Sequence, residues 1–497
     1  MRKLLIGLDY GSDSGRAVLL DAQSGELLAQ ASMDYPRWAE RLYSDEEKSS
    51  YRQSPKDYLE VTEYLLREMA QARPESSKVV AIGIDATAST PILLDEDFAC
   101  ISEEDPDAMF ILWKDHSALK EAEELSLRAG NYTAHSGGIY SAENYWSKVL
   151  HVLRHNPLMA RKAKIAVELC DYIPYMLTGV YRKSRCAAAS KQMWSGSWGG
   201  YPPEEFFEQL HPTMARICHN LGNDTYYASQ PCAFLSGIWA EKTGLGEDVL
   251  VSVGNIDAHS GAIAASCSPD TMVFNLGTSA CIMALASHSR MAPGVFGQAE
   301  GTIIPGFEGI EMGLSSFGDS FAWFSRFCGR SLEDLNASAS GLPLCPDLPL
   351  CTDWLNGRRS PFPKPGASAS FSGIRLSTTP EAIYYSLVEA NAFGIKAIVD
   401  HLDAYGIKAS RYIAIGGISA KSPFIMQILS DVLGHDIEIC SESQACARGA
   451  AICASVAAGI YPDLHLAQKV LCPKTSHTFA PRGEDHTERY RNYLKYR

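Results

Sequence analysis

The sequence predicts an α/β protein built from two large domains. Its 497 residues exceed what one hydrophobic core normally accommodates, and 46% apolar and 21% charged residues are ordinary globular values. Several apolar runs end in glycine and polar residues and are followed by helical patterns, which is typical of strands that lead into helices. Two strand–turn–strand units, one near the amino terminus and one past the middle, indicate a duplicated domain.

The composition narrows the classes of partner and compartment. A net charge of −14 disfavours a nucleic-acid or anionic-membrane partner. No apolar run is long enough to span a bilayer, and the first apolar run ends at Asp9, too early for a signal-peptide core. We therefore expect a cytoplasmic chain whose 14 cysteines are reduced, and their spacings match no zinc pattern.

The first strand–turn–strand unit covers residues 4–21, which read LLIGLDYGSDSGRAVLLD. Serine hydroxyls and turn amides can donate to phosphate oxygens, an arginine adds positive charge, and an aspartate can hold a hydrated Mg²⁺. An exposed polar hairpin is an equally good interpretation of this stretch alone. The polar residues at its tip are Asp9, Gly11, Ser12, Ser14 and Arg16.

The second unit covers residues 272–285 and carries Gly277, Thr278 and Ser279 at its tip. Two facing phosphate-binding hairpins would explain both tips at once, so the pair favours phosphate binding. A later strand at 412–415 leads into Gly416-Gly417, which suits close approach to a base or ribose. The lysine that follows, Lys421, lacks the preceding glycine of a Walker A loop, so we reject that motif.

Two further strands end in an acidic residue. Residues 79–84 lead to Asp85 and a hydroxyl-rich turn, and the run from Val249 leads to Asp257, which opens a helix of small residues. In α/β proteins, ligands commonly bind at the carboxyl ends of strands. On its own, the second stretch favours the simpler interpretation that Asp257 caps the helix.

Other signals are local or negative. Thr379-Pro380-Glu381 predicts the start of a helix that continues to about Gly406. Residues 329–349 read as the least regular part of the second half. No H-E-x-x-H, G-x-S-x-G or G-x-G-x-x-G motif occurs, which argues against zincin, α/β-hydrolase and ordinary dinucleotide-binding functions.

From Ile6 to about Gly459, the chain resembles the FGGY carbohydrate kinase family. The matching segments include GLDYGSDSGRAVLLD, GIDATASTP, ELCDYIP, VGNIDAHSGA, LGTS, FGDSFAWF and GGISAKS. The resemblance implies two actin-like (ribonuclease H-like) ATPase domains flanking a catalytic cleft. Residues 1–258 would bind sugar and carry the first phosphate hairpin, and residues 259–497 would bind ATP.

The resemblance also implies an activity, namely ATP- and Mg²⁺-dependent phosphorylation of a sugar. The LWKDH and SWGGYPP stretches are similar to the branch of the family that converts L-ribulose to L-ribulose 5-phosphate in L-arabinose catabolism. A kinase for another ketopentose or pentitol, such as D-ribulose, ribitol or xylulose, is the alternative. The expected partners are the sugar and ATP, and a homodimer is compatible with the family.

Site residues follow from the same resemblance. Asp257 matches the catalytic base, and Asp9 matches the metal-binding segment. On sequence alone, Trp113 would be assigned to the core and Lys191 to a solvated surface. The positions that match the sugar site are Ala86, Thr87, Trp113, Lys191, Asp257 and Glu311. Those that match the ATP site are Gly11, Ser12, Ser14, Arg16, Gly277, Thr278, Ser279, Gly416, Gly417 and Lys421.

Overall fold

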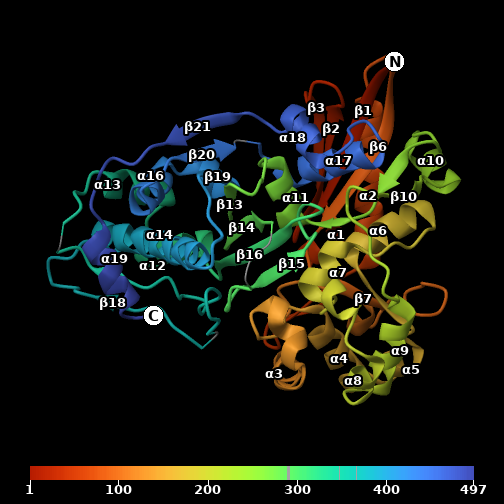
Figure 1. Cartoon of the computed structure of the whole chain (residues 1–497), viewed down its shortest axis with the longest axis horizontal. Helices are drawn as coiled ribbons and strands as arrows, with labels where there is room; N and C mark the ends of the chain where they lie inside the picture. The colour runs from red at the N-terminus through yellow and green to blue at the C-terminus, as the bar shows by residue number, and fades with distance from the viewer. Residues whose placement is uncertain (288–290, 346, 365, 441) are drawn as a thin grey trace. The chain divides into compact units, whose positions relative to one another are not determined.

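The computed structural model describes residues 1–287, 291–345, 347–364, 366–440 and 442–497. They form two compact units, each assembled from three separate stretches of chain (Figure 1). Unit 1 comprises residues 1–266, 299–307 and 444–472, and unit 2 comprises residues 267–298, 308–443 and 473–497. The expected domain boundary after residue 258 stays a prediction.

Unit 1 is built on a seven-stranded sheet in the order β10-β11-β6-β1-β2-β3, with β12 also paired to β6. The strands are β1 (Arg2–Tyr10), β2 (Ser14–Asp21), β3 (Leu27–Asp34), β6 (Ser77–Ala86), β10 (Pro231–Phe234), β11 (Leu250–Ser252) and β12 (Asn255–Ile256). Strands β1, β11 and β12 run parallel to β6. Strand β2 is antiparallel to both of its neighbours, β1 and β3. The pairing of β1 with β2 confirms the first predicted hairpin.

Helices cover both faces of this sheet. Helix α2 packs on β2 and β3, and α17 packs on β1 and β6, although α17 comes from the far end of the chain (Figure 1). The contact with α17 is made through backbone: a Cβ on Gly7 would lie 1.7 Å from the carbonyl oxygen of Ala447. On Gly83 it would lie 1.9 Å from that of Ala450. Glycine is therefore required at both positions.

The other elements of unit 1 surround this core. Its helices are α1 (Pro36–Ala39), α2 (Pro55–Gln71), α3 (Leu119–Arg128), α4 (Tyr145–His155), α5 (Pro157–Lys162), α6 (Leu169–Thr178), α7 (Arg185–Lys191), α8 (Glu204–Glu208), α9 (Pro212–Leu221), α10 (Gly237–Thr243), α11 (Asp257–Ala264), α17 (Ala445–Ala457) and α18 (Leu464–Leu471). Its short strands are β4 (Ser44–Asp45), β5 (Ser50–Gln53), β7 (Pro91–Leu94), β8 (Phe110–Ile111) and β9 (Ile165–Glu168).

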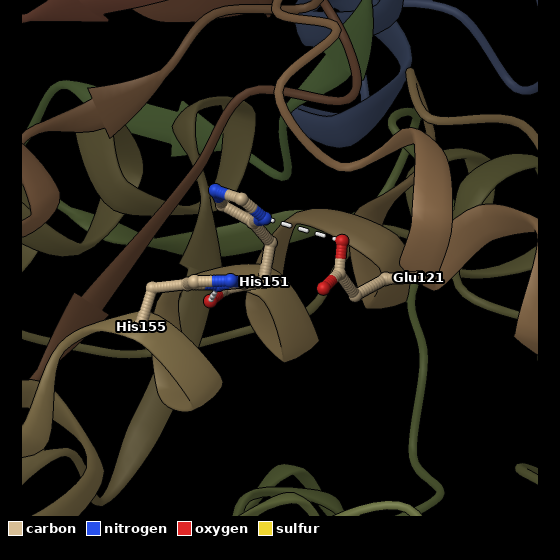
Figure 2. Close-up of side chains that lie close together, drawn as sticks. All are labelled: Glu121, His151 and His155. Atoms are coloured by element: carbon tan, nitrogen blue, oxygen red, sulfur yellow. Dashed lines mark hydrogen bonds and ion pairs between the residues drawn. The ribbon is translucent and has the colours of Figure 1, made fainter.

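Helices α3 and α4 are joined by a partly buried contact between a histidine and a glutamate. His151 Nδ1 of α4 lies 3.1 Å from Glu121 Oε2 of α3 (Figure 2). One turn further along α4, His155 Nδ1 lies 2.8 Å from the carbonyl oxygen of His151. The contact between His151 and Glu121 holds α4 against α3, whereas that of His155 lies within α4.

Unit 2 contains the other seven-stranded sheet, in the order β15-β16-β14-β13-β19-β20-β21. These strands are β13 (Thr271–Leu276), β14 (Ala280–Ala286), β15 (Gly297–Glu300), β16 (Glu308–Leu314), β19 (Arg411–Ile415), β20 (Ile437–Cys440) and β21 (Thr475–Phe479); β17 (Leu350–Cys351) pairs with β18 (Phe371–Ser372) separately. The antiparallel pair β13 and β14 confirms the second predicted hairpin.

The helices of unit 2 are α12 (Gly318–Cys328), α13 (Leu332–Ser340), α14 (Pro380–Ala404), α15 (Gly417–Lys421), α16 (Pro423–Leu433) and α19 (Thr487–Leu494). The predicted start of α14 is confirmed, because the Thr379 side chain accepts a hydrogen bond from the Ala382 amide. The prediction that residues 329–349 are irregular is wrong in part, because α13 lies there. Ser331 caps α13, and Leu335 and Ala339, one turn apart, are buried beneath a largely polar surface.

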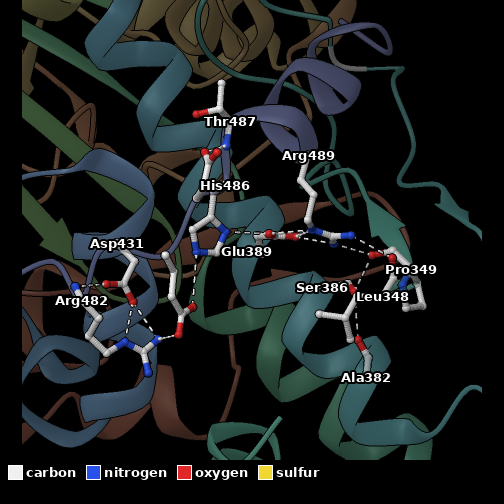
Figure 3. A network of polar contacts seen from close by, with 12 residues as sticks. Leu348, Pro349, Ala382, Ser386, Glu389, Asp431, Arg482, His486, Thr487 and Arg489 are labelled. Atoms are coloured by element: carbon white, nitrogen blue, oxygen red, sulfur yellow. Dashed lines mark hydrogen bonds and ion pairs between the residues drawn. The ribbon is translucent and has the colours of Figure 1, made fainter. Parts of the chain in front are cut away.

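Buried charges fasten the carboxyl-terminal segment to unit 2 (Figure 3). Glu389 of α14 lies 2.8 Å from His486 Nδ1 and 2.9 Å from Arg489 Nε. In the same segment, Arg482 Nη2 lies 2.7 Å from Asp431 Oδ2 of α16. Within the described parts of the chain, no helix is both long enough and apolar enough to cross a membrane.

Candidate active site

The tip of the first hairpin is closed by short-range contacts. The Gly11 amide donates to the carbonyl of Ser14 at 3.1 Å. Asp9 and Arg16 face each other across β1 and β2, with Arg16 Nη1 3.2 Å from Asp9 Oδ2. The carboxylate of Asp9 is buried, while Arg16 remains partly exposed. The tip thus combines a turn, hydroxyls and one accessible cation.

Two side chains from elsewhere in unit 1 hold Ser12 at this tip. Gln53 Nε2 donates to the Ser12 carbonyl at 2.6 Å, and Trp113 Nε1 donates to the Ser12 hydroxyl at 2.8 Å. Trp113 is half-buried and also packs against the core of unit 1. A residue expected to shape the sugar site is therefore bonded directly to one expected to contact phosphate.

Three acidic residues converge at the carboxyl ends of neighbouring strands. Asp85 lies opposite Asp9 in the pairing of β6 with β1, and opposite Asn255 in the pairing with β12. Asp257 follows as the first residue of α11, where its Oδ1 accepts the Ala258 amide at 2.6 Å. The N-cap position itself belongs to the preceding residue, which makes no side-chain cap bond. Asp257 is thus the first residue of the helix and not its N-cap.

Burial and mutual repulsion perturb this acidic cluster. Burial raises the pKa of Asp9 above its ordinary value, although Arg16 acts in the opposite direction. The pKa of Asp85 is raised well above its ordinary value by burial and then by the charges of Asp9 and Asp257. Asp85 is 0% exposed, and among the described residues neither Oδ atom has a hydrogen-bond partner.

Asp85 is the acidic residue that the family resemblance did not assign. Its position after a buried strand was visible in the sequence, and the same rule that drew attention to Asp257 applies to it. What the sequence did not contain is the strand register, which sets Asp85 between Asp9 and the β12–α11 junction.

The expected sugar-site residues of unit 1 lie around the same edge. Ala86 ends β6, and the Thr87 amide donates to the Tyr10 carbonyl at 3.0 Å, which fixes the turn against β1. Lys191 ends α7 and is only 4% exposed, so the expectation of a solvated lysine is wrong. Its charge acts to lower the pKa of the buried Glu168 of β9. Glu168 in turn accepts hydrogen bonds from Ser89 and Thr90, which follow Thr87 in the turn.

In unit 2, the second hairpin is packed backbone to backbone. The Gly277 amide donates to Ser279 at 3.0 Å, and the Gly318 amide donates to the Gly277 carbonyl at 3.0 Å. The Thr278 carbonyl accepts the amides of the first turn of α12. Gly416 has φ +96°, and a Cβ there would lie 2.6 Å from the Leu276 carbonyl. The two glycine-rich segments expected to bind nucleotide are therefore adjacent.

The remaining expected site residues of unit 2 differ in setting. Glu311 lies on β16, is nearly buried and has Arg359 Nη2 at 4.0 Å. Gly417 begins α15 and Lys421 ends it, with the lysine exposed. Arg359 also lies over the ring of Phe296, 3.9 Å from its centroid, which holds the guanidinium beside Glu311.

Comparison with known proteins matches both halves of the chain. The model of the N-terminal domain of the FGGY family of carbohydrate kinases matches residues 4–264, and that of the C-terminal domain matches residues 272–458. The chain belongs to the FGGY family of carbohydrate kinases. It is a sugar kinase, and kinases of this family use ATP as the phosphate donor.

Relatives within the FGGY family align over nearly the whole chain. A protein named ribulokinase from Vibrio parahaemolyticus is 36% identical, covering 99% of this chain and 94% of the relative. One of the same name from Shouchella clausii is 33% identical, covering 98% and 92%.

Solved structures confirm the predicted two-domain α/β fold. A xylulose kinase from Brucella ovis superimposes with a TM-score of 0.87 at 20% identity, covering 99% of this chain and 98% of that one. Plasmodium falciparum glycerol kinase with ADP gives a TM-score of 0.82 at 15% identity, covering 100% and 97%. At these identities, the similarity establishes the fold alone.

Proposed function

We propose that this FGGY kinase transfers the γ-phosphoryl group of ATP to the 5-hydroxyl of L-ribulose, giving L-ribulose 5-phosphate and ADP. The proposal is supported by the relatives named ribulokinase, which align with 98–99% of the chain at 33–36% identity. The chemistry is supported above all by one observation: Asp257 opens α11 next to two strand-end acids and the phosphate hairpin.

Asp257 is the proposed catalytic base. The amino-terminal end of a helix carries a partial positive charge, which favours the carboxylate form needed to accept a proton. As the sugar 5-oxygen bonds to the γ-phosphorus, the hydroxyl proton passes to the Asp257 carboxylate. The bond from that phosphorus to the bridging oxygen breaks, and ADP leaves with the bond's electron pair.

The acidic pair Asp9 and Asp85 suits a divalent cation. Two adjacent buried carboxyl groups repel each other, and the Oδ atoms of Asp85 lack partners among the described residues. Oxygen ligands of this kind are those that Mg²⁺ prefers, so Asp9 would hold the ion with Asp85 beside it. When bound, Mg²⁺ supplies positive charge that offsets the charge of the phosphate groups.

The remaining roles concern binding. In unit 1, Gly11, Ser12, Ser14 and Arg16 would donate to phosphate oxygens. In unit 2, Gly277, Thr278, Ser279, Gly416, Gly417 and Lys421 would bind the rest of ATP. Ala86, Thr87, Trp113, Lys191 and Glu311 would bind the sugar, with the lysine and glutamate bonded to its hydroxyl groups.

The test is ADP release with Mg·ATP and a panel of L-ribulose, D-ribulose, D-xylulose and ribitol. We expect the highest kcat/KM with L-ribulose. No response to any of the four would overturn the pentose-kinase proposal. A higher kcat/KM with another member of the panel would replace L-ribulose by that sugar or pentitol.

A further inference from the structure

The proposed mechanism does not use Lys148, a buried cation of unit 1. Lys148 lies in the first turn of α4 and is only 1% exposed. Its Nζ donates to the carbonyl oxygens of Ser89 at 2.6 Å, Leu112 at 2.8 Å and Trp113 at 3.3 Å. The Ile111 carbonyl lies further away, at 3.5 Å. An ammonium group has three N–H donors, and here they face backbone acceptors from two separate segments.

These acceptors belong to the turns that carry the proposed sugar contacts. Ser89 follows Ala86 and Thr87 in the turn after β6, and Leu112 immediately precedes Trp113 after β8. One side chain therefore spans both turns. Because Trp113 is also bonded to the Ser12 hydroxyl, the same contacts extend to the phosphate hairpin.

A buried carboxylate binds the first turn from another strand. Glu168, the last residue of β9, accepts the Ser89 hydroxyl and also the Thr90 amide at 2.8 Å. Lys148 and Glu168 thus bind the same serine, one through its carbonyl and the other through its hydroxyl. Burial raises the pKa of Glu168, although these two hydrogen bonds and the charges of Lys148 and Lys191 act to lower it.

Burying these groups is energetically unfavourable, which makes a purely structural role a poor explanation. Burial, with a smaller contribution from the charge of Arg52, lowers the pKa of Lys148 to about 7, although the charges of Asp115, Glu168 and Glu143 act to raise it. An apolar side chain of similar length would fill the same space without this cost. What it could not do is fix the separation of the two turns.

We propose that Lys148 and Glu168 are positioning residues, which hold the Ala86–Thr90 turn and Trp113 in the geometry that sugar binding requires. This inference rests on the proposed function, because that function makes these turns the sugar site. Lys148 is itself fixed by its helix, since the contact between His151 and Glu121 anchors α4 on α3 (Figure 2).

The test compares two buried lysines that make the same kind of contact. Lys148→Met removes the hydrogen bonds that join the two turns, which we call the clamp. The control Lys183→Met removes a lysine that is 2% exposed and bonds the carbonyls of Leu221 and Gly222. We expect Lys148→Met to raise the KM for L-ribulose about tenfold or more, with a smaller rise in the KM for ATP because Trp113 also bonds Ser12. Lys183→Met should leave both KM values unchanged.

A second variant and a second readout keep the test decisive. Glu168→Gln retains the size of the side chain but loses one acceptor, and it should raise the sugar KM in the same direction. Hydrogen exchange at the amides of Thr87, Thr90 and Trp113 should accelerate in Lys148→Met and not in Lys183→Met. This exchange readout requires no turnover, so it tests the clamp even if no pentose is phosphorylated.

Equal sugar KM values in wild type, Lys148→Met and Glu168→Gln would overturn the inference, as would equal shifts in the two lysine variants. Unchanged amide exchange in Lys148→Met would do the same. If the wild type phosphorylates no sugar of the panel while exchange changes as expected, the proposed function fails and the clamp stands.

Discussion

The indole nitrogen of Trp113 donates a 2.8 Å hydrogen bond to the hydroxyl of Ser12. The bond joins the segment after β8 to the tip of the first hairpin, although the two residues are 101 positions apart. Within unit 1, the groups proposed to contact sugar and phosphate are therefore joined by hydrogen bonds. A substitution in one group should alter binding at the other.

Trp113→Phe should test this link. The variant keeps an aromatic ring and removes the donor, and the loss of one hydrogen bond of about 1 kcal/mol corresponds to about a fivefold rise in the KM for ATP. The matched control is Trp194→Phe, which removes a 2.9 Å bond to the carbonyl of Asn223, outside the hairpin. Steady-state kinetics of both variants would contradict the link if their KM values for ATP were equal.

Asp257→Asn should separate catalysis from binding. The amide keeps the size of the side chain and can still accept the Ala258 amide, but it cannot take a proton from the sugar hydroxyl. We expect kcat to fall about 10²- to 10⁴-fold, the usual contribution of a general base. Calorimetric titration should show unchanged affinity for ATP. Near-normal turnover would exclude Asp257 as the base.

Gly318→Ala should disturb the second hairpin. A Cβ at this position would lie 2.6 Å from the Gly277 carbonyl, so one of the two backbone segments must move. Such overpacking typically costs about 1–3 kcal/mol, and we expect a lower melting temperature and a higher KM for ATP. In the control Gly341→Ala, the Cβ would have its nearest neighbour at 3.7 Å. Equal KM values for ATP in the two variants would refute a role for this packing in ATP binding.

Lys183→Met should alter the pH dependence of stability. Burial lowers the pKa of Lys183 from 10.5 to about 8 in the folded chain, against the attraction of Asp171. Between about pH 8 and pH 10.5, the unfolded chain keeps a proton on Lys183 that the folded chain has lost. The free energy of unfolding therefore rises with pH by up to about 1.4 kcal/mol per unit. Below pH 8 both states are protonated and this contribution is constant.

Urea unfolding of wild type and Lys183→Met near pH 7.5 and 9.5 measures this effect. The stability of wild type relative to the variant should increase at the higher pH. A difference that does not change between the two conditions would show that Lys183 keeps its ordinary pKa in the folded chain.

Local patterns in the sequence predicted the elements whose signals are local. Both hairpins and the start of α14 were predictable, because apolar runs, glycine-rich turns and a threonine cap lie within a few residues of one another. Helix α13 was missed because most of its residues are polar and its apolar stripe is short, consisting of Leu335 and Ala339.

The buried polar groups could not be predicted in this way. A lone lysine is usually solvated, yet Lys148 and Lys191 are buried, and the partners of Lys148 are carbonyl oxygens 35 to 59 residues away. No side-chain pattern marks a carbonyl acceptor. Asp85 was visible as an acid after a strand, but its place between Asp9 and Asn255 depends on strand register.

The close contact of α17 with Gly7 and Gly83 has a consequence for biosynthesis. The strands that carry Asp9 and Asp85 leave the ribosome long before residues 445–457, which form the helix that covers their face. Until then, an apolar sheet face lies bare in the growing chain, a setting that favours aggregation. This face of the sheet can be covered only after residues 445–457 have been made, so a chain cut short before them would lack the covering helix.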